Sequence, residues 1–342
     1  MSDSGTTSPF DDLRQMLANL PEADETARGQ VIARDKTLTK PQGSLGRLEE
    51  IAEWLAAWQG KAPPSADRPL IALFAANHGV AARGISAYPT SVTAQMVQNF
   101  SSGGAAVNQL AQTFGAGLQV YELALDYPTP DIAEAEAMNE KDCMGTIVFG
   151  MQALEQPCDI LCLGEMGIGN TTIAAALSAA LYGGSASDWV GCGTGIDDEG
   201  RARKLEAVEA ALTHHGDALD DPLEALRRVG GREFAALAGA IAAARFRQVP
   251  VLLDGYAVTA AAAVLERVQP GALDHCIAAH VSQEPGHRLL LEKLGKKPLL
   301  DLDLRLGEGS GAVLALGLVK AAAAVHRGMA TFEDAGISGP VG

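Results

Sequence analysis

DILCLGEMGIGNTTIAAALSAALYG, residues 159–183, places an apolar run directly before a glycine turn and an alanine-rich run. The first run is predicted to be a buried strand that ends at Gly164. The second is predicted to be a helix, with Thr171 and Thr172 where residues that cap or begin a helix are found. A strand joined through a tight turn to a helix is the unit from which parallel α/β sheets are built.

The same unit recurs from Pro69 onward, where short apolar runs end in glycine-rich turns and helical stretches usually follow. The strands that we expect are 69–76, 118–125, 159–165, a short one before Gly191, 249–255 and 275–282. The helices that we expect are 92–114, 171–183, 199–215, 234–246, 257–268, 287–295 and 311–332. This alternation predicts an α/β fold with a mostly parallel sheet covered by helices on both faces.

The beginning of the chain has a different pattern. Residues 1–68 are polar and helical in character, with Leu48, Ile51 and Leu55 at helical spacing. We therefore divide the chain into an N-terminal helical region, 1–68, and an α/β catalytic domain, 69–342. The last helix is a candidate to pack back on the N-terminal region.

Charge and hydropathy exclude two classes of partner. The chain has 42 acidic and 26 basic residues, a formal net charge of −16, which argues against nucleic acid because phosphates are neutralised by clustered Lys and Arg. A small ligand with one phosphate needs only a local anion site. The longest uncharged stretch, 166–187, contains polar residues and glycines, so we expect a buried helix there and no membrane span.

The cysteines indicate a reducing compartment. There are five of them, an odd number, and their spacing follows no metal-binding pattern. We expect a cytoplasmic protein with no metal site and no cofactor.

The loop after the strand at 159–165 is a candidate anion site, because ligands of open parallel sheets bind beyond the carboxyl ends of the strands. Glu165 follows the strand, Gly167 and Gly169 allow tight turns, and Asn170 and Thr171 open the helix. Free amides at a helix N-terminus suit a phosphate. The alternative is a turn that merely needs glycine. Another glycine loop, 191–204, ends with Lys204, which could reach the same phosphate or be an exposed helix lysine.

Two other loops offer chemistry. Asn77, His78, Tyr88 and Gln95 could line a pocket for a flat aromatic ligand, although a histidine after a strand is more often structural. In LGEGSG, Glu308 stands between two glycines, where a ligand can approach closely. If Glu308 is buried, its pKa rises and suits a general base; the alternative is an exposed turn.

Several common enzyme motifs are absent from the sequence. It contains no dinucleotide-binding G-x-G-x-x-G after a strand, no G-x-x-x-x-G-K-[ST] phosphate loop and no G-x-S-x-G elbow. It also lacks the paired acids and threonine-rich loop expected of enzymes that use a pyrophosphorylated ribose with magnesium.

Seven segments occur in one order that is distinctive as a set. They are KPQGSLGRLEE, ANHGVAARGISAYPTSVTAQMVQNF, GGAAVNQLA, LGEMGIGNTT, GCGTG, SQEPGHRLLLEKLG and LDLRLGEGSGAVLAL. Over about residues 36 to 332 the chain resembles the nicotinate-nucleotide:dimethylbenzimidazole phosphoribosyltransferases, which make the lower-ligand nucleoside of cobalamin.

The resemblance implies a three-layer Rossmann-like fold, a homodimer and a metal-free reaction. Its substrates would be nicotinate mononucleotide and 5,6-dimethylbenzimidazole, and its products α-ribazole 5′-phosphate and nicotinate. Glu308 matches the proposed base and Glu165 a second active-site carboxylate. The residues that match substrate-binding positions are Gly167, Gly169, Asn170, Thr171 and Lys204 for the phosphate, Ser282 in a donor-side loop, and Tyr88 and Gln95 at the benzimidazole pocket.

The chain departs from the family pattern in three places. Gln42 stands where the family usually has proline, Asn77 where many members have aspartate, and DGYAVTA at 254–260 is an uncommon form of its loop. These departures bear on acceptor preference and leave Glu308 unchanged. The competing hypotheses are a nucleotide hydrolase or phosphosugar isomerase that uses the same phosphate loops, and a binding protein without turnover.

Overall fold

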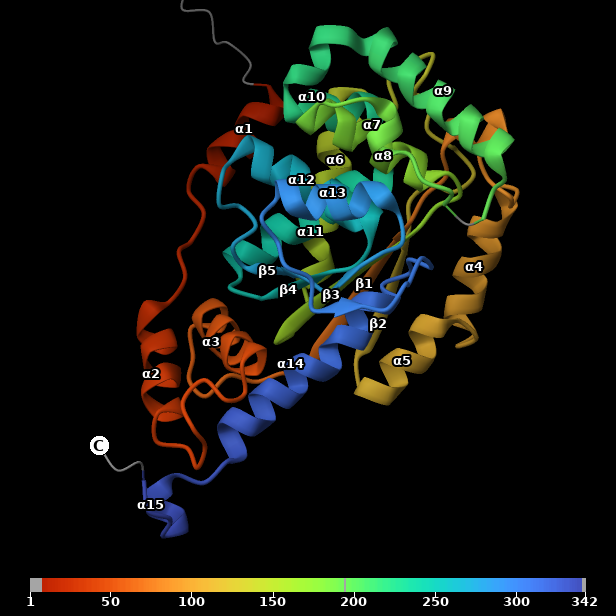
Figure 1. Ribbon diagram of the computed structural model, residues 1–342. Helices are drawn as coiled ribbons and strands as arrows, with labels where there is room; N and C mark the ends of the chain where they lie inside the picture. Colours follow the sequence, from red (N-terminus) through yellow and green to blue (C-terminus); the bar gives the residue numbers. More distant parts are fainter. Residues whose placement is uncertain (1–7, 194, 340–342) are drawn as a thin grey trace, which may run out of the picture.

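The computed structural model describes residues 8–193 and 195–339. Its centre is a sheet of five parallel strands in the order β2-β1-β3-β4-β5 (Figure 1). The strands are β1 Pro69–Ala75, β2 Gly117–Glu122, β3 Ile160–Met166, β4 Val251–Leu253 and β5 Cys276–Ala278. β1 pairs with both β2 and β3, so the strand order reverses between β1 and β3. In sheets of this kind a ligand binds outside the carboxyl ends of the strands at this point.

Helices cover both faces of the sheet, which confirms the predicted α/β class. One face carries α6 Glu140–Met151, α7 Asn170–Tyr182, α10 Pro222–Val229, α11 Arg232–Phe246 and α12 Tyr256–Val268. The other carries α3 Arg47–Gln59, α5 Ala106–Phe114 and α14 Ser310–Gly328. Alternate side chains of β1 enter opposite cores: Leu70 and Phe74 pack on the first face, and Ile71 and Leu73 on the second. A strand buried on both faces reads as one continuous apolar run.

The C-terminal helix returns to the N-terminal helices, as expected. α14 runs from the carboxyl ends of the strands to α2, Glu25–Asp35, and α3 at the lower left of Figure 1. Arg34 Nε donates to the His326 carbonyl oxygen at 3.1 Å, and α15, Phe332–Ala335, begins where Phe332 N donates to Thr37 O at 2.9 Å. α1, Pro9–Leu17, packs against α6 instead.

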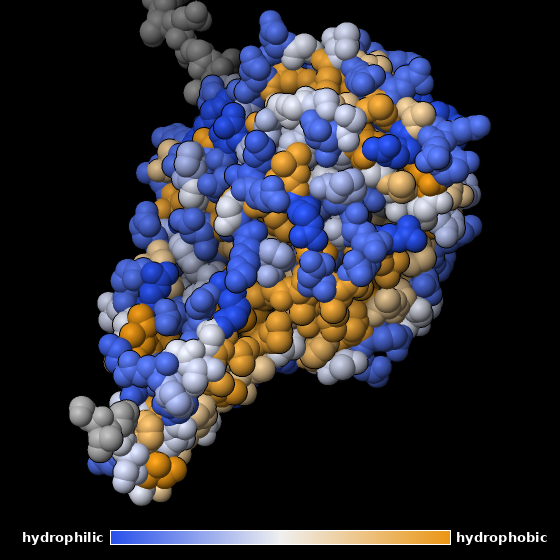
Figure 2. All heavy atoms as spheres, viewed as in Figure 1, coloured by the Kyte–Doolittle hydropathy of each residue, from blue (hydrophilic) through white to orange (hydrophobic). Residues whose placement is uncertain are grey.

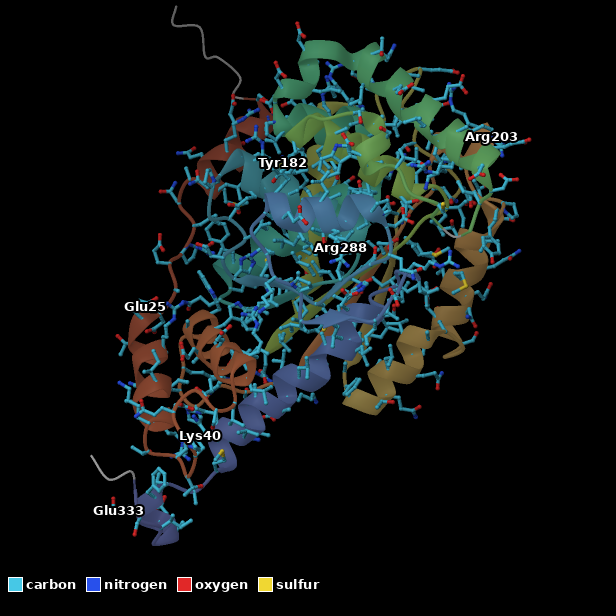
Figure 3. All side chains as sticks on the ribbon, viewed as in Figure 1. Glu25, Lys40, Tyr182, Arg203, Arg288 and Glu333 are labelled. Carbon is cyan, nitrogen blue, oxygen red and sulfur yellow. The ribbon has the colours of Figure 1, made fainter. Side chains whose placement is uncertain are left out.

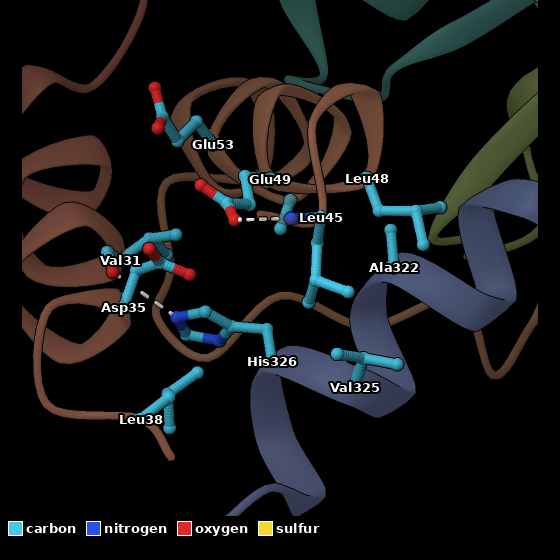
Figure 4. A pocket seen from close by; sticks show the side chains of 11 residues that line it. Val31, Asp35, Leu38, Leu45, Leu48, Glu49, Glu53, Ala322, Val325 and His326 are labelled. Carbon is cyan, nitrogen blue, oxygen red and sulfur yellow. Dashed lines mark hydrogen bonds between the residues drawn. The ribbon is translucent and has the colours of Figure 1, made fainter. Parts of the chain in front are cut away.

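A small hollow lies between α2, α3 and the far end of α14 (Figure 4). Its walls are mainly apolar, with His326 and Glu53 among them. Beside it, the buried Lys40 Nζ lies 2.7 Å from both Asp35 Oδ2 and Glu49 Oε1 (Lys40 is labelled in Figure 3). These contacts hold the loop after α2 against α3. They lie near the C-terminal end of α14, far from the carboxyl ends of the strands.

The structure corrects several predicted elements. The single helix at 92–114 is two helices, α4 Ser91–Ser101 and α5, separated at Gly103 and Gly104. α8, Ala186–Trp189, occupies the place of the short strand before Gly191. The strand at 275–282 divides into β5 and β6, His280–Val281, and β6 pairs with β7, Leu300–Asp301, in a separate two-stranded sheet. β3 continues past Gly164 to Met166, so Glu165 lies within it.

The buried helix predicted within 166–187 is α7, which is almost wholly enclosed over the sheet. α14 is the helix in the described part of the chain with the length and hydropathy to cross a membrane. Half of its apolar window is buried, because it packs on α3, α5 and the strands of the sheet. α14 is therefore a core helix of the fold.

Candidate active site

A pocket lies at the carboxyl ends of β3 and β4, beside β6. The residues that line it include Glu165, Gly167, Asn170, Thr171, Gly193, Tyr256, His280, Ser282, Glu284, Arg305 and Gly307. They come from segments that are far apart in the sequence: the β3–α7 turn, the loop before α9 (Asp198–His215), the start of α12, and the segments on either side of β6 and β7. Convergence at the strand ends is what the parallel sheet predicts.

The turn that carries Glu308 has an unusual backbone. Gly307, Glu308 and Gly309 all have positive φ, at 81°, 63° and 77°. The left-handed region costs a residue with a side chain roughly 1–2 kcal/mol, so a glutamate is held there only by its surroundings. Part of those surroundings is Gly164 of β3, where an added Cβ would lie 2.8 Å from the Glu308 carbonyl carbon. The turn therefore rests directly on the strand.

The Glu308 side chain is buried beside the pocket, at 5% exposure, and its Oε2 has no hydrogen-bond partner among the described residues. Burial, followed by the charge of Asp254, raises the pKa of Glu308 to about 7. A carboxylate without a donor at one oxygen is free to accept a proton, and a pKa near neutrality suits general-base chemistry. The structure thus supports the buried alternative for Glu308 over an exposed turn.

Glu165 reaches the same turn from β3. An added Cβ at Gly307 would lie 2.5 Å from Glu165 Oε1, and the Asn170 amide donates to Glu165 Oε2. Burial raises the pKa of Glu165 to about 8, with further contributions from Asp254, Glu233 and Glu308, against the hydrogen bond from Asn170. Both carboxyl groups are therefore suited to proton transfer near neutral pH.

Lys204 is almost fully buried, at 1% exposure, in the second turn of α9. Its Nζ donates to Thr171 Oγ1 at 2.8 Å and would lie 3.0 Å from a Cβ on Gly193. Burial lowers the pKa of Lys204, while Glu284 and Cys192 act in the opposite direction. A buried ammonium beside the N-terminus of α7 has the charge that suits an anion. Lys204 is therefore not an exposed helix lysine.

The other predicted donor-side residues complete this wall. Gly169, at φ 94°, is the N-cap of α7. Gly167 lines the pocket, and a Cβ added to it would lie 2.9 Å from Ala76 O. Ser282, 8% exposed, accepts from Glu284 N at 3.1 Å and its own amide donates to His287 Nδ1 at 2.9 Å.

Sequence reasoning missed two charged residues of the wall. Glu284 Oε1 accepts from Gly193 N at 2.8 Å, and Arg305 Nη1 lies 3.3 Å from the Gly193 carbonyl oxygen. Together they hold the 191–195 loop, of which Thr194 lies outside the described residues. The available signal was position: Glu284 follows β6, and Arg305 stands three residues before Glu308.

The residues proposed for the aromatic ligand do not enter this pocket. Tyr88 is 52% exposed, and Gln95 is exposed on α4. Their segment adjoins the site, since Thr93 Oγ1 accepts from Ile168 N at 3.3 Å. Arg203 Nε donates to Gly84 O at 2.9 Å, which ties α9 to the Tyr88 loop (Figure 3).

Asn77 and His78 lie behind the pocket. The Asn77 amide donates to Leu125 O at 3.0 Å, and His78 Nε2 is 2.6 Å from Glu233 Oε1. Within residues 8–193 and 195–339, no group of three or more His, Cys, Asp or Glu side chains is arranged to hold a metal ion.

Comparison with known proteins connects this geometry to a family. The phosphoribosyltransferase family profile matches residues 20–337. The nicotinate-nucleotide–dimethylbenzimidazole phosphoribosyltransferases of Sinorhizobium fredii and Rhizobium meliloti are each 60% identical to the chain over 338 residues, covering 99% of both sequences.

Solved structures agree with the sequence relatives. A crystal structure of CobT from Thermus thermophilus covers 92% of this chain and 100% of its own, at 43% identity and a TM-score of 0.85. A structure of the nicotinate-nucleotide–dimethylbenzimidazole phosphoribosyltransferase of the same organism covers 93% of this chain and 100% of its own, at 42% identity and a TM-score of 0.86. The chain belongs to the nicotinate-nucleotide–dimethylbenzimidazole phosphoribosyltransferase family.

Proposed function

We propose that this enzyme transfers the ribosyl 5′-phosphate of nicotinate mononucleotide to 5,6-dimethylbenzimidazole, with Glu308 as the general base. The observation that carries the role of Glu308 is its buried carboxylate, which has an unpartnered oxygen and directly follows Gly307, a residue that lines the same pocket as Thr171, the partner of Lys204. Transfer of a ribosyl phosphate needs a base and a phosphate site close to one pocket.

The reaction is a single displacement. The free ring nitrogen of the benzimidazole forms a bond to C1′ of the ribose, and the bond from C1′ to the pyridinium nitrogen breaks. Nicotinate leaves with that electron pair, so its nitrogen needs no proton. The N–H proton of the benzimidazole passes to Glu308, which removes the positive charge that attack builds on the ring. Direct attack inverts the anomeric carbon, and a β-nucleotide becomes an α-riboside.

The donor phosphate is proposed to bind at the N-terminus of α7, with Lys204 and Thr171. The positive end of the α7 helix dipole and a buried ammonium both favour an anion. Arg305 at the rim adds a second positive charge. In this arrangement phosphate binding needs no divalent cation, which fits a donor whose leaving group is an aromatic base rather than pyrophosphate.

The acceptor side stays a prediction. Tyr88 and Gln95 lie on the segment that adjoins the pocket through Thr93, and we propose that they border the benzimidazole when it binds. Acceptor choice is then decided by this exposed segment, while the chemistry depends on the buried groups.

A homodimer in the cytoplasm is the proposed state of the enzyme. Figure 2 shows hydrophobic side chains gathered on the face where α14 lies. Leu302 and Leu306 are each 53% exposed, and Leu318 of α14 is only partly buried. Apolar surface of this kind is typical of an interface between copies of a chain. The division into regions 1–68 and 69–342 likewise stays a proposal.

Glu308→Gln tests the base directly, because the amide keeps the shape of the side chain and cannot accept the proton. Product formation from nicotinate mononucleotide and dimethylbenzimidazole should fall by about 10²–10⁴-fold, while donor affinity persists. The control is Glu292→Gln, an exposed glutamate of α13, Pro285–Lys293. Near-normal turnover of folded Glu308→Gln would contradict the assignment and make Glu165 the next candidate. Nicotinate release without added benzimidazole would instead indicate a hydrolase.

A further inference from the structure

A second buried carboxylate, Asp254, lies directly behind the turn that carries Glu308. It follows β4 and is 0% exposed. Asp254 Oδ2 accepts from Gly309 N at 3.0 Å, and Oδ1 accepts from Ala312 N at 2.9 Å. Both oxygens therefore bind the backbone that begins at the residue after Glu308.

These hydrogen bonds supply what α14 lacks at its beginning. The N-cap of α14 is Gly309, which has no side chain to bind the free amides of the first turn. Asp254 takes that role from another strand, and its negative charge lies at the positive end of the helix dipole. By anchoring both Gly309 and Ala312, Asp254 restrains the left-handed conformation that Glu308 would otherwise leave.

His280 of β6 partners this carboxylate. It is 2% exposed, and its Nε2 lies 3.4 Å from Asp254 Oδ1, an ion-pair distance without hydrogen-bond alignment. An added Cβ at Gly311 would lie 2.0 Å from His280 Cδ2, so the ring rests on the first turn of α14. The same ring lines the pocket. His280 and Asp254 thus join the pocket wall, the end of β4 and the start of α14.

The charged and titratable groups around this pair come from each neighbouring element. The charge of Asp254 acts on Glu308 of the α14 turn and on Glu165 of β3, and the charge of Glu233 of α11 also acts on Glu165. Cys162 of β3 is near Asp254, and the His287 ring of α13 is 6.0 Å from the His280 ring. Apart from Cys162 and His287, these neighbours are carboxyl groups, and His280 is the basic partner of Asp254 among them.

We propose that Asp254 and His280 are positioning residues of the reaction. Asp254 holds the turn that aims Glu308, its charge sets the pH at which Glu308 accepts the proton, and His280 moderates that charge. This inference rests on the proposed role of Glu308 as base.

The titration of these groups agrees with the proposal. After burial, the charge of Asp254 is the cause that raises the pKa of Glu308. Burial alone would raise the pKa of Asp254, but His280 and the Ala312 and Gly309 amides outweigh it and lower that pKa. Burial would lower the pKa of His280, and Asp254 reverses this and raises it. Asp254 is therefore ionised where Glu308 titrates.

The test is the pH dependence of kcat in Asp254→Asn and His280→Gln. Asp254→Asn removes the negative charge that raises the pKa of Glu308, so the acidic limb of the plot of kcat against pH should move to lower pH by about one unit. Its plateau kcat should fall about 10- to 100-fold because the turn loosens. His280→Gln leaves Asp254 unbalanced, so its acidic limb should move to higher pH. A purely structural role would lower activity without shifts of opposite sign.

The matched control is Asp159→Asn. Asp159 is also a buried aspartate that accepts hydrogen bonds from backbone amides, those of Asp67 and Arg68, but it precedes the amino end of β3, whereas Asp254 follows the carboxyl end of β4. This variant should be less stable than the parent enzyme, and the acidic limb of its pH profile of kcat should stay at the same pH. Circular dichroism and thermal unfolding verify that each variant is folded, and His280→Gln carries the test if Asp254→Asn does not fold.

Glu308→Gln separates the two ways in which the proposal can fail. If Glu308 is not the base, the acidic limb persists in the residual activity of Glu308→Gln. If Glu308 is the base, the limb disappears in that variant. In that case, an unmoved limb in folded Asp254→Asn, or shifts of the same sign in both variants, overturns the role of Asp254 and His280.

Discussion

Lys204→Met is the sharpest probe of the anion site. Methionine retains most of the length of the lysine stem and removes the ammonium, so the substitution isolates the charge from the packing of a side chain that is 1% exposed. Among residues 8–193 and 195–339, Lys204 Nζ has one side-chain hydrogen-bond partner, Thr171 Oγ1 at 2.8 Å, and an ammonium has three N–H groups to donate.

The expected loss follows from those contacts. A hydrogen bond between charged groups contributes about 1.5–3 kcal/mol, which corresponds to roughly 10- to 150-fold in Kd for the donor. The burial that lowers the pKa of Lys204 also means that the charge is poorly solvated before the donor arrives, which places the loss toward the upper end of that range. Acceptor affinity should change little, because the predicted acceptor residues lie on another segment.

The assay is isothermal titration of nicotinate mononucleotide and, separately, of dimethylbenzimidazole. Lys40→Met is the matched control, since Lys40 is also buried but pairs with Asp35 and Glu49 far from the strand ends. It should reduce the free energy of unfolding and leave both affinities unchanged. Unchanged donor affinity in folded Lys204→Met would refute the anion site at α7 and direct attention to Arg305.

The turn at Glu308 is the basis of two further predictions. Gly164→Ala should lower kcat at least tenfold and reduce the free energy of unfolding by about 1–3 kcal/mol, because its Cβ would lie 2.8 Å from the Glu308 carbonyl carbon. The control is Gly145→Ala, whose Cβ would have no atom within 4 Å. Unchanged turnover in Gly164→Ala would contradict the contact. Because the pKa of Glu308 is raised to about 7, the contribution of its protonated carboxyl group to the free energy of unfolding is complete below the ordinary glutamate pKa. This contribution is lost as the pH rises toward 7. Glu308→Gln should therefore unfold like the parent enzyme near pH 4.5 and be more stable, by up to about 3 kcal/mol, above pH 7; urea unfolding at both pH values measures this, and equal stability at high pH would contradict it.

Local sequence patterns predicted the strand–turn–helix unit at 159–183, and the glycines on either side of Glu308 identified it as a candidate, because both features depend on neighbouring residues in the sequence. The break between α4 and α5 was also local, because Gly103 and Gly104 stand together, and our reading of 92–114 as one helix overlooked them. The division of 275–282 into β5 and β6 could not be predicted from the local sequence, because it depends on the pairing of β6 with Leu300–Asp301, which is distant in the sequence.

The same distinction applies to the site. Residue type and position after a strand identified Glu165 and Glu308 as candidates. They could not show that Lys204 is buried, because its burial depends on Thr171 and Gly193, 33 and 11 positions away in sequence. The role of Asp254 was hidden for the same reason, since the amides that it binds are 55 and 58 residues further along the chain.

α14 links the turn that carries Glu308 to the N-terminal helices. Glu308 precedes its first turn, and its last turns are fastened to α2 by Arg34. Its 19 residues make a rod of about 28 Å, so a tilt of about 5° about the far end would displace the start by roughly 2.5 Å. Catalytic groups tolerate about 0.5 Å of displacement. The contacts at both ends of α14, with α2 and α3 at its far end and with Asp254 at its start, therefore bear on how accurately Glu308 is placed.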